Sequence, residues 1–222
     1  MKKYGIWLFD CDGVILDSNP LKTEAFRRVG MAHGAREAES LVRYHLNNGG
    51  ISRFDKLEFF FREICGEIEF HDKLRAALAD YGEFVSAGLH RCPELPGVRD
   101  FLERLRRAKG IRTFVVSGSH EEELREVFKV RGLDQYFDGI FGSPAKKCDI
   151  ITSLCSRERS TGPPRRIVFC GDSRLDYEVA MACCIEFIMV YGYTEWEGWR
   201  EAIRGDIISA RDFRELVGRV EV

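Results

Sequence analysis

The sequence predicts an α/β protein in which a doubly wound parallel sheet is interrupted by a helical insertion. From residue 96 onward, short apolar runs ending in small polar turns alternate with helical patterns. Such alternation makes right-handed crossovers and a parallel sheet covered on both faces. Residues 19–91 lack strand-like runs and carry helical spacing instead. We therefore expect a core domain of residues 1–18 and 92–222 and a helical domain at 19–91.

Five apolar runs, each followed by a small polar turn, are the expected strands. Residues 4–9 are apolar and aromatic and end at an Asp-Cys-Asp-Gly turn, as a buried strand does where it reaches a polar loop. The other expected strands are residues 113–116, 139–141, 167–170 and 187–190.

Helical spacing marks three segments of the core and one long stretch of the insertion. Apolar residues three and four apart predict a helix over 98–105, and a second pattern at 124–128 follows a Ser119-x-x-Glu122 capping box. A third helix is expected over 177–184, after a start signal at Ser173. The spaced apolar residues of the insertion are Phe54, Leu57, Phe61, Ile64 and Ile68.

The composition is that of a folded globular protein. The chain has 222 residues, of which 45% are hydrophobic and 32% charged, and its formal net charge is −2. This length suits one large domain or a main domain with a smaller insertion. A nearly neutral chain lacks the basic field that nucleic-acid binders use, so nucleic acid is not an expected partner.

The sequence predicts neither a secreted nor a membrane-spanning protein. Asp10 stops the apolar run at residues 6–9 before a signal-peptide core can form, and no stretch approaches the roughly 20 apolar residues of a membrane span. The eight cysteines include no Cys-x-x-Cys pair. We expect reduced thiols in the cytoplasm, most of them small buried residues, and no membrane partner.

Polar side chains collect where the expected strands end. Asp10 and Asp12 follow the first strand, Ser117 follows the second, and Asp172 and Asp176 follow the fourth. Ligands of parallel sheets bind at the carboxyl ends of the strands, so these oxygens are expected to meet in one cleft. Residues two apart in an extended segment share a face, which lets both Asp10 and Asp12 point into that cleft. An isolated Asp-x-Asp pair would equally suit a turn or a calcium loop.

Four motifs, in order along the chain, resemble those of the haloacid dehalogenase superfamily of phosphotransferases. The first is FDCDGVILDS at residues 9–18, and the fourth is GDSRLD at 171–176; both are fairly specific. The second, at 115–119, and the third, which ends at Lys147, are weaker patterns. Val14 departs from the threonine that many phosphatases of this family carry, although valine is also common there.

The resemblance implies a Rossmann-like core and a covalent phosphatase mechanism. Asp10 would attack phosphorus to form an aspartyl-phosphate, which divides the reaction into two easier steps. Asp12 would protonate the leaving oxygen and then deprotonate the attacking water. Family members that cleave carbon–halogen bonds generally lack this second acid, so Asp12 favours a phosphatase.

The resemblance also implies a Mg²⁺ site. Its protein ligands would be the Asp10 carboxylate, the Asp12 backbone carbonyl and the Asp172 carboxylate. Asp176 would accept hydrogen bonds from the waters of the metal. A capping box between Ser173 and Asp176 is an alternative reading of the same residues, and the two roles are compatible.

The expected phosphate-binding groups come from the second and third motifs. Ser117 would donate its hydroxyl to a phosphate oxygen, helped by the Gly118 amide. Lys147 would neutralise the clustered anions, and it is preferred over Lys146 because similar Gly-Ser-Pro sequences place the lysine five residues after the glycine. An ordinary helix-start serine and solvated lysines are the alternatives.

The insertion corresponds to the helical cap of the family's phosphoglycolate phosphatase and β-phosphoglucomutase branch. In that branch a cap loop closes over the substrate, and the segment NGGISR at 48–53 resembles it. Arg53 would then bind an anionic or hydroxylated leaving group. Arg43, His45 and Asn47 are further candidates, and all four could equally be polar residues on the cap surface.

We expect a Mg²⁺-dependent phosphatase of a small phosphorylated metabolite, either a sugar phosphate or a phosphoglycolate-like acid, that is a monomer or a weak homodimer. A β-phosphoglucomutase-like mutase is the nearest alternative. Lys22 argues against it, because such mutases carry a histidine twelve residues after the nucleophile. A non-catalytic phosphometabolite-binding protein would have lost an acidic motif residue, and none is missing. The sequence does not select the substrate.

Overall fold

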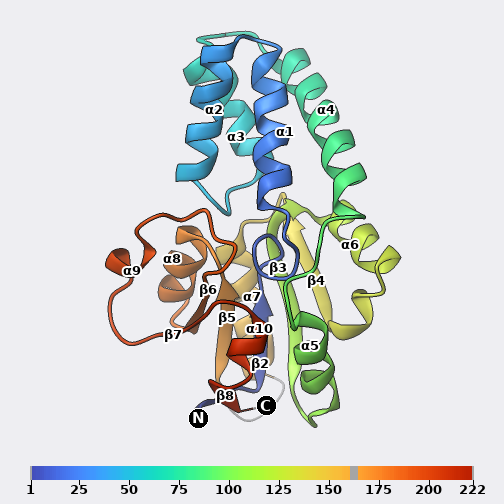
Figure 1. Ribbon diagram of the computed structural model, residues 1–222, viewed down its shortest axis with the longest axis vertical. Coiled ribbons are helices and arrows are strands. Elements are labelled where there is room, and N and C mark those ends of the chain that lie inside the picture. Colours follow the sequence, from blue (N-terminus) through green and yellow to red (C-terminus); the bar gives the residue numbers. More distant parts are fainter. Residues whose placement is uncertain (1, 161–164, 222) are drawn as a thin grey trace.

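The computed structural model describes residues 2–160 and 165–221, and its centre is a six-stranded, all-parallel sheet (Figure 1). The strand order is β4-β3-β2-β5-β6-β7. The strands are β2 (Ile6–Phe9), β3 (Arg112–His120), β4 (Gly139–Ser143), β5 (Ile167–Gly171), β6 (Glu186–Val190) and β7 (Ile208–Ala210). A separate parallel pair joins β1 (Lys2–Lys3) to β8 (Val220–Glu221) near the chain termini.

The strand order places β2 between β3 and β5. The chain passes from β2 outward to β3 and β4, and then crosses back to β5 on the other side of β2. The direction of winding therefore reverses beside β2, and such a reversal opens a crevice at the carboxyl ends of the strands. The residue that follows β2 is Asp10, so this aspartate enters the crevice directly.

Two helical layers cover the sheet because successive strand residues face opposite sides. Trp7 and Phe9 pack in one hydrophobic core, whereas Ile6 and Leu8 pack in the other. The first core includes side chains of α5 (Val98–Arg107), α6 (Glu121–Val130) and α10 (Phe213–Leu216), and the second those of α7 (Lys147–Ser160) and α8 (Arg174–Ala182). The short helices η2 (Asp134–Tyr136) and α9 (Trp199–Ala202) lie in connecting segments.

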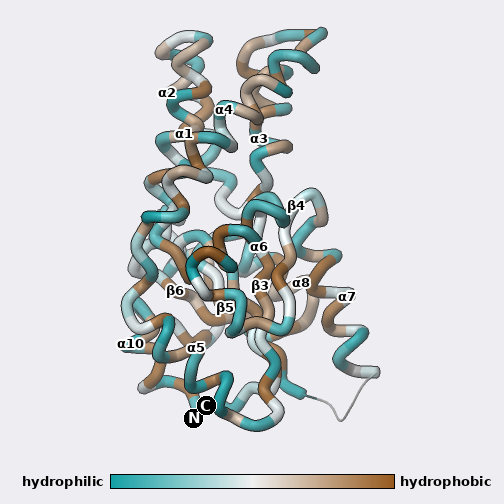
Figure 2. The backbone as a smooth tube through the Cα atoms, turned by 90° about the vertical axis from the view of Figure 1, so that its right-hand side faces the viewer, coloured by the Kyte–Doolittle hydropathy of each residue, from teal (hydrophilic) through white to brown (hydrophobic). Residues whose placement is uncertain are grey.

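A helical cap stands on one end of this layered core (Figures 1 and 2). It contains α1 (Asn19–Met31), α2 (Ala35–Asn47), α3 (Arg53–Phe59), the π-helical turn η1 (Phe60–Ile64) and α4 (His71–Leu89). Phe26, Leu41, Phe60 and Tyr81 fill its interior, which is continuous with the first core of the sheet domain. This continuity lets the cap pack against the sheet domain instead of standing apart from it.

The fold class predicted from the sequence is confirmed, and two local predictions are wrong. Ser119 does not begin a capping box: it lies within β3, and His120 is the residue before α6. Ile68 does not continue the apolar face of the cap, since it lies beyond η1 and is 92% exposed. Gly66, with φ of 68°, ends the helical run before Ile68 is reached.

The sequence also missed β7 and the β1–β8 pair, all of them three residues long or shorter. Half of the eight cysteines are buried, so the expectation that most would be buried is too strong; the buried ones are Cys11, Cys92, Cys155 and Cys170. Among residues 2–160 and 165–221, no helix combines the length and hydrophobicity that crossing a bilayer requires.

Candidate active site

Asp10, which directly follows the central strand β2, forms a buried ion pair with Lys147. Lys147 Nζ lies 2.9 Å from Asp10 Oδ2 and 2.7 Å from Asp176 Oδ1, and all three side chains are buried. The other oxygen, Asp10 Oδ1, accepts a hydrogen bond of 2.8 Å from the backbone amide of Cys11. These contacts fix the orientation of the Asp10 carboxylate. Lys146, by contrast, is exposed.

Three carboxylates meet beside Lys147 and form a donor set that fits a hard cation. One oxygen from each of Asp10, Asp172 and Asp176 lies within 4.8 Å of the others. Burial raises the pKa of Asp10 to about 7 against the lowering effect of Lys147, and Asp176 and Asp12 add to the rise. Burial together with Asp10 and Asp176 raises the pKa of Asp172 well above its ordinary value. A bound divalent cation would offset this repulsion, and an all-oxygen set suits Mg²⁺.

Asp176 has two further roles in the local structure. Its side chain accepts a hydrogen bond from the backbone amide of Ser173, and the Ser173 hydroxyl accepts one from the backbone amide of Asp176. This is the capping box anticipated from the sequence, and it begins α8. The same carboxylate binds Lys147 through its other oxygen, so capping and contact with the acidic cluster coexist.

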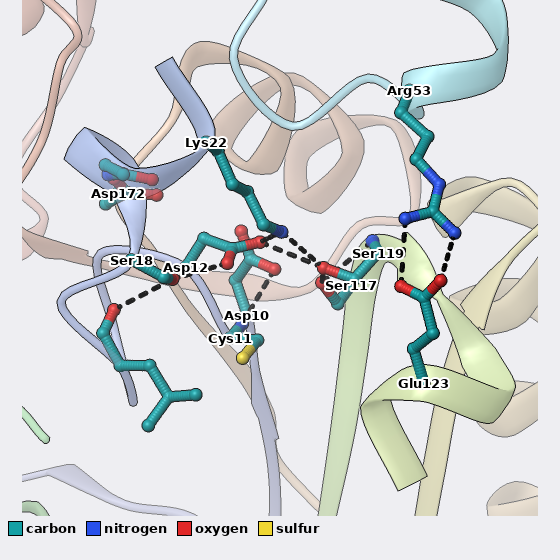
Figure 3. A network of polar contacts seen from close by, with 12 residues as sticks. Asp10, Cys11, Asp12, Ser18, Lys22, Arg53, Ser117, Ser119, Glu123 and Asp172 are labelled. Carbon is teal, nitrogen blue, oxygen red and sulfur yellow. Dashed lines mark hydrogen bonds and ion pairs between the residues drawn. The ribbon is translucent and has the colours of Figure 1, made fainter. Parts of the chain in front are cut away.

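Asp12 lies two residues beyond Asp10 and is held by a separate set of groups (Figure 3). Lys22, in the first cap helix, forms an ion pair with Asp12 Oδ2, and the Ser119 hydroxyl donates to the same oxygen at 3.1 Å. The Ser18 hydroxyl donates to Asp12 Oδ1 at 2.5 Å. Burial raises the pKa of Asp12, but Lys22 and the hydroxyl hydrogen bonds outweigh burial, so the pKa falls below its ordinary value.

The end of β3 contributes Ser117 and Gly118 opposite Asp12. The Ser117 hydroxyl donates to Ser119 Oγ at 3.1 Å and accepts from the Ser119 amide at the same distance. Gly118 lies against the cap loop: a β-carbon on it would be 2.4 Å from the carbonyl oxygen of Gly50. Only a residue without a side chain permits this close backbone approach.

Asn19 holds the third acidic residue in place. Its amide nitrogen donates to Asp172 Oδ2 at 2.8 Å and to the carbonyl oxygen of Tyr193 at 3.0 Å. Gly13 makes room for this contact, since a β-carbon there would lie 2.2 Å from Asp172 Oδ2 and 2.5 Å from Asn19 Nδ2. The sequence analysis placed Asn19 at the start of the helical domain and missed its role. Its position right after the first motif was the available signal.

Arg53, the predicted substrate-binding residue of the cap loop, contacts the core domain (Figure 3). Its two terminal nitrogens donate to the carboxylate of Glu123, on α6, at 2.9 and 2.5 Å. Its guanidinium also lies 5.4 Å from the centre of the Tyr81 ring. Within the described residues, its buried Nε has no hydrogen-bond partner. A role for Arg53 in substrate binding stays a prediction.

A cavity of about 1150 Å³ lies between the cap and the core domain. Asp10, Asp12 and Asp172 line it from the core domain, and Lys22 and Arg53 line it from the cap. The other cap candidates named from the sequence also line it: Arg43, His45 and Asn47. Sequence reasoning missed three further lining residues, namely Lys56, Glu123 and Glu195. They lie outside the four motifs, so only the fold brings them to this cavity.

Comparison with known sequences identifies the family of this chain. The model of the haloacid dehalogenase-like hydrolase family matches residues 6–182. The chain is 28% identical over 193 residues to the phosphorylated carbohydrates phosphatase of Thermotoga maritima, a match that covers 83% of each chain. It is 27% identical over 195 residues to the phosphoglycolate phosphatase of Pseudomonas putida, covering 84% of this chain and 69% of that one.

Solved structures share the fold over nearly the whole chain. CbbY from Rhodobacter sphaeroides, determined in complex with phosphate, superposes with a TM-score of 0.72 at 24% identity and covers 96% of each chain. A haloacid dehalogenase-like family protein from Streptococcus pneumoniae gives a TM-score of 0.70 at 18% identity over 99% of each chain. The family model and the phosphatase relatives confirm the predicted family and the prediction of an enzyme. This chain belongs to the haloacid dehalogenase-like hydrolase family.

Proposed function

We propose that this chain is a Mg²⁺-dependent phosphatase that acts on a small phosphorylated carbohydrate or acid by way of an aspartyl-phosphate. The observation that carries the proposal is the pairing of two differently held carboxylates at one strand end. Asp10 forms an ion pair with Lys147 and is part of the acidic cluster. Asp12 instead forms an ion pair with Lys22 and accepts hydrogen bonds from Ser18 and Ser119. Covalent phosphoryl transfer needs this division between a nucleophile and a proton-transferring group.

The first step forms the aspartyl-phosphate. A carboxylate oxygen of Asp10 bonds to phosphorus while the bond from phosphorus to the substrate oxygen breaks. The leaving oxygen takes its proton from Asp12. Lys147 and the hydroxyl of Ser117 stabilise the charge on the remaining phosphoryl oxygens. Mg²⁺ held by Asp10, Asp172 and the Asp12 carbonyl would supply positive charge that offsets repulsion between the acidic cluster and a phosphate dianion.

The second step releases inorganic phosphate. A water attacks phosphorus, Asp12 accepts its proton, and the bond between phosphorus and the Asp10 oxygen breaks. The low pKa that Lys22 gives Asp12 favours the carboxylate, which is the form that accepts a proton in this step; the first step uses the protonated form of Asp12, which is the minor one. Hydrolysis is thus favoured over the mutase alternative, in which this step must be restrained. A non-catalytic binding role is disfavoured because the four acidic residues expected at the site are all present: Asp10, Asp172 and Asp176 form the acidic cluster, and Asp12 lines the cavity.

Phosphate release from p-nitrophenyl phosphate and from glycerol 3-phosphate, with Mg²⁺ and with excess chelator, tests the proposal. We expect activity only with the divalent ion and a loss of orders of magnitude in Asp10→Asn. Asp12→Ala is expected to slow formation of the aspartyl-phosphate far more with glycerol 3-phosphate, because an alkoxide needs protonation and a nitrophenolate does not. Full activity in chelator or in Asp10→Asn would contradict the metal requirement or the covalent route, respectively.

A further inference from the structure

Away from the acidic cluster, a second polar group of side chains lies in the same cavity. We call it the distal cluster; it consists of Thr23 on α1, His45 on α2, Lys56 on α3 and Glu195 in the segment after β6. His45, Lys56 and Glu195 line the cavity. Lys56 is 2% exposed and His45 is 7% exposed, which is unusual for such polar side chains.

The four side chains form one continuous hydrogen-bonded chain. Lys56 Nζ lies 2.7 Å from His45 Nδ1, His45 Nε2 lies 3.0 Å from Thr23 Oγ1, and the Thr23 hydroxyl donates to Glu195 Oε1 at 2.8 Å. At pH values below its pKa of about 7, Lys56 is an ammonium that can only donate, so Nδ1 of His45 then accepts and Nε2 carries the ring proton. In that form the hydrogen bonds run in one direction, from a cation in the cap to a carboxylate on the core domain.

The four hydrogen-bonded side chains leave an unused donor and an unused acceptor at the cavity wall. Among the described residues, Lys56 Nζ has one hydrogen-bond partner, so donors remain. Glu195 Oε2 has no hydrogen bond within 3.5 Å in the described part of the chain; its nearest cation-forming neighbour is His45 Nε2 at 3.7 Å. Burial raises the pKa of Glu195, with Asp12 adding and Thr23 and Lys56 opposing, which is the response of a carboxylate short of partners.

We propose that the distal cluster is a specificity site that binds hydroxyl groups on the non-phosphorylated end of a sugar phosphate. This inference rests on the proposed phosphatase function and narrows its substrate class. A hydroxyl both donates and accepts, so neighbouring hydroxyls can donate to Glu195 and accept from Lys56 at once. Thr23 and His45 act as positioning residues, because they orient the two charged groups.

A carboxylate at the same end of the substrate fits this site poorly. It could accept from Lys56, but it would also face the Glu195 carboxylate, and like charges in a partly buried site repel. The extent of the cavity is consistent with this, because Asp10 and three members of the distal cluster, His45, Lys56 and Glu195, line the same cavity.

Steady-state kinetics with three kinds of substrate test this inference. The first kind is a panel of ribose 5-phosphate, fructose 6-phosphate and glucose 6-phosphate, of which the best is used. The second is 2-phosphoglycolate, and the third is p-nitrophenyl phosphate, which offers the distal cluster no hydroxyl. The variants are Glu195→Gln, Lys56→Met and Thr23→Val. The control is Glu24→Gln. Glu24 follows Thr23 on α1 and is half exposed, and its replacement removes the same negative charge as Glu195→Gln does.

We expect the wild-type protein to prefer the sugar phosphate to 2-phosphoglycolate in kcat/KM by about 10-fold or more, given the strength of hydrogen bonds to charged groups. Glu195→Gln and Lys56→Met lower kcat/KM for the sugar phosphate by about 10-fold or more. Both variants keep kcat/KM for p-nitrophenyl phosphate within about 2-fold of the wild-type value, a smaller change than the loss of one hydrogen bond would cause. Glu195→Gln also raises kcat/KM for 2-phosphoglycolate, Thr23→Val gives an intermediate loss, and Glu24→Gln changes nothing.

Several outcomes would overturn the inference while leaving the phosphatase intact. Equal losses on all three substrates would make the distal cluster a structural bridge between cap and core. If the variants keep the wild-type kinetics on the sugar phosphate, the distal cluster does not bind the substrate. If the wild-type protein prefers 2-phosphoglycolate, the proposed specificity is wrong. Failure to release phosphate from any substrate, including p-nitrophenyl phosphate with Mg²⁺, would instead overturn the proposed function itself, and this inference with it.

Discussion

The guanidinium of Arg53 and the carboxylate of Glu123 form two parallel hydrogen bonds across the interface between cap loop and core domain. Paired bonds of this geometry are the strong form of an ion pair, and the Arg53 side chain is only 10% exposed. The pair therefore joins the loop at residues 48–53 to α6, and both residues line the cavity.

If this pair holds the cap closed, Arg53→Ala and Glu123→Gln should each lower kcat/KM for a sugar phosphate by about 10-fold, a typical effect of losing a positioned charge pair. The double variant should lose little more than either single one, because the two residues act together. Glu122→Gln, the exposed neighbour on α6, is the matched control. Additive losses would show that Arg53 acts on the substrate independently of Glu123.

The close approach of Gly118 to the cap loop gives a second test of closure. In Gly118→Ala, the added β-carbon would meet the Gly50 carbonyl oxygen at 2.4 Å, so the loop must move away from the second motif. The amide proposed to bind phosphate is retained. We expect kcat/KM to fall by about 10-fold or more, with the melting temperature nearly unchanged, because closure and not folding is affected.

Gly218→Ala is the control for this change, because its β-carbon would make an ordinary contact of 3.6 Å with Glu215. Normal kinetics in Gly118→Ala would mean that catalysis does not require the loop to lie against β3.

Lys22 sets the charge state of Asp12, and this has a consequence for the pH dependence of the reaction. The Lys22 ammonium and the hydroxyl hydrogen bonds hold the pKa of Asp12 below its ordinary value despite burial. Lys22→Met should therefore raise this pKa, and the acidic limb of the kcat profile should move to higher pH by about one unit or more. Lys22→Arg keeps the charge and should move the limb much less. Identical profiles for all three proteins would separate Lys22 from the chemistry.

Lys56 makes stability depend on pH in a predictable direction. Burial lowers the pKa of Lys56 to about 7 in the folded protein, and Lys22 adds to this. Between pH 7 and the ordinary lysine value near 10.4, the unfolded chain binds the proton and the folded protein does not. The free energy of unfolding therefore falls as the pH is lowered through this window, by up to about 1.4 kcal/mol per pH unit from this group.

Urea unfolding of the wild-type protein and of Lys56→Met at several pH values between 7 and 10 measures this effect. The variant should lack this part of the pH dependence, so its stability relative to the wild type should increase as the pH falls. A difference between the two proteins that stays constant with pH would mean that Lys56 has an ordinary pKa in the folded protein.

The parallel sheet and the acidic residues at its carboxyl edge could be predicted from the sequence alone. Short apolar runs predict buried strands, and the carboxyl ends of parallel strands lie at the same edge of the sheet. Asp10, Asp12, Asp172 and Asp176 could be named for this reason before any coordinates existed. The preference for Lys147 over Lys146 came from the family resemblance and stays a prediction; in the structure Lys147 is buried beside Asp10 and Lys146 is exposed.

The partners of these residues, by contrast, depend on how distant parts of the chain pack together. Asp12 is paired with Lys22, ten residues away on a cap helix, and with Ser119, more than a hundred residues away. Arg53 contacts Glu123, and Thr23 contacts Glu195, across the interface between the cap and the core domain. Hydrophobic periodicity predicts which face of a helix or strand is buried, but it does not predict how the cap and the core domain are oriented relative to each other. Specificity groups such as Lys56 and Glu195 arise from that docking, since each lies outside every motif and becomes part of a site only when the cap covers the sheet.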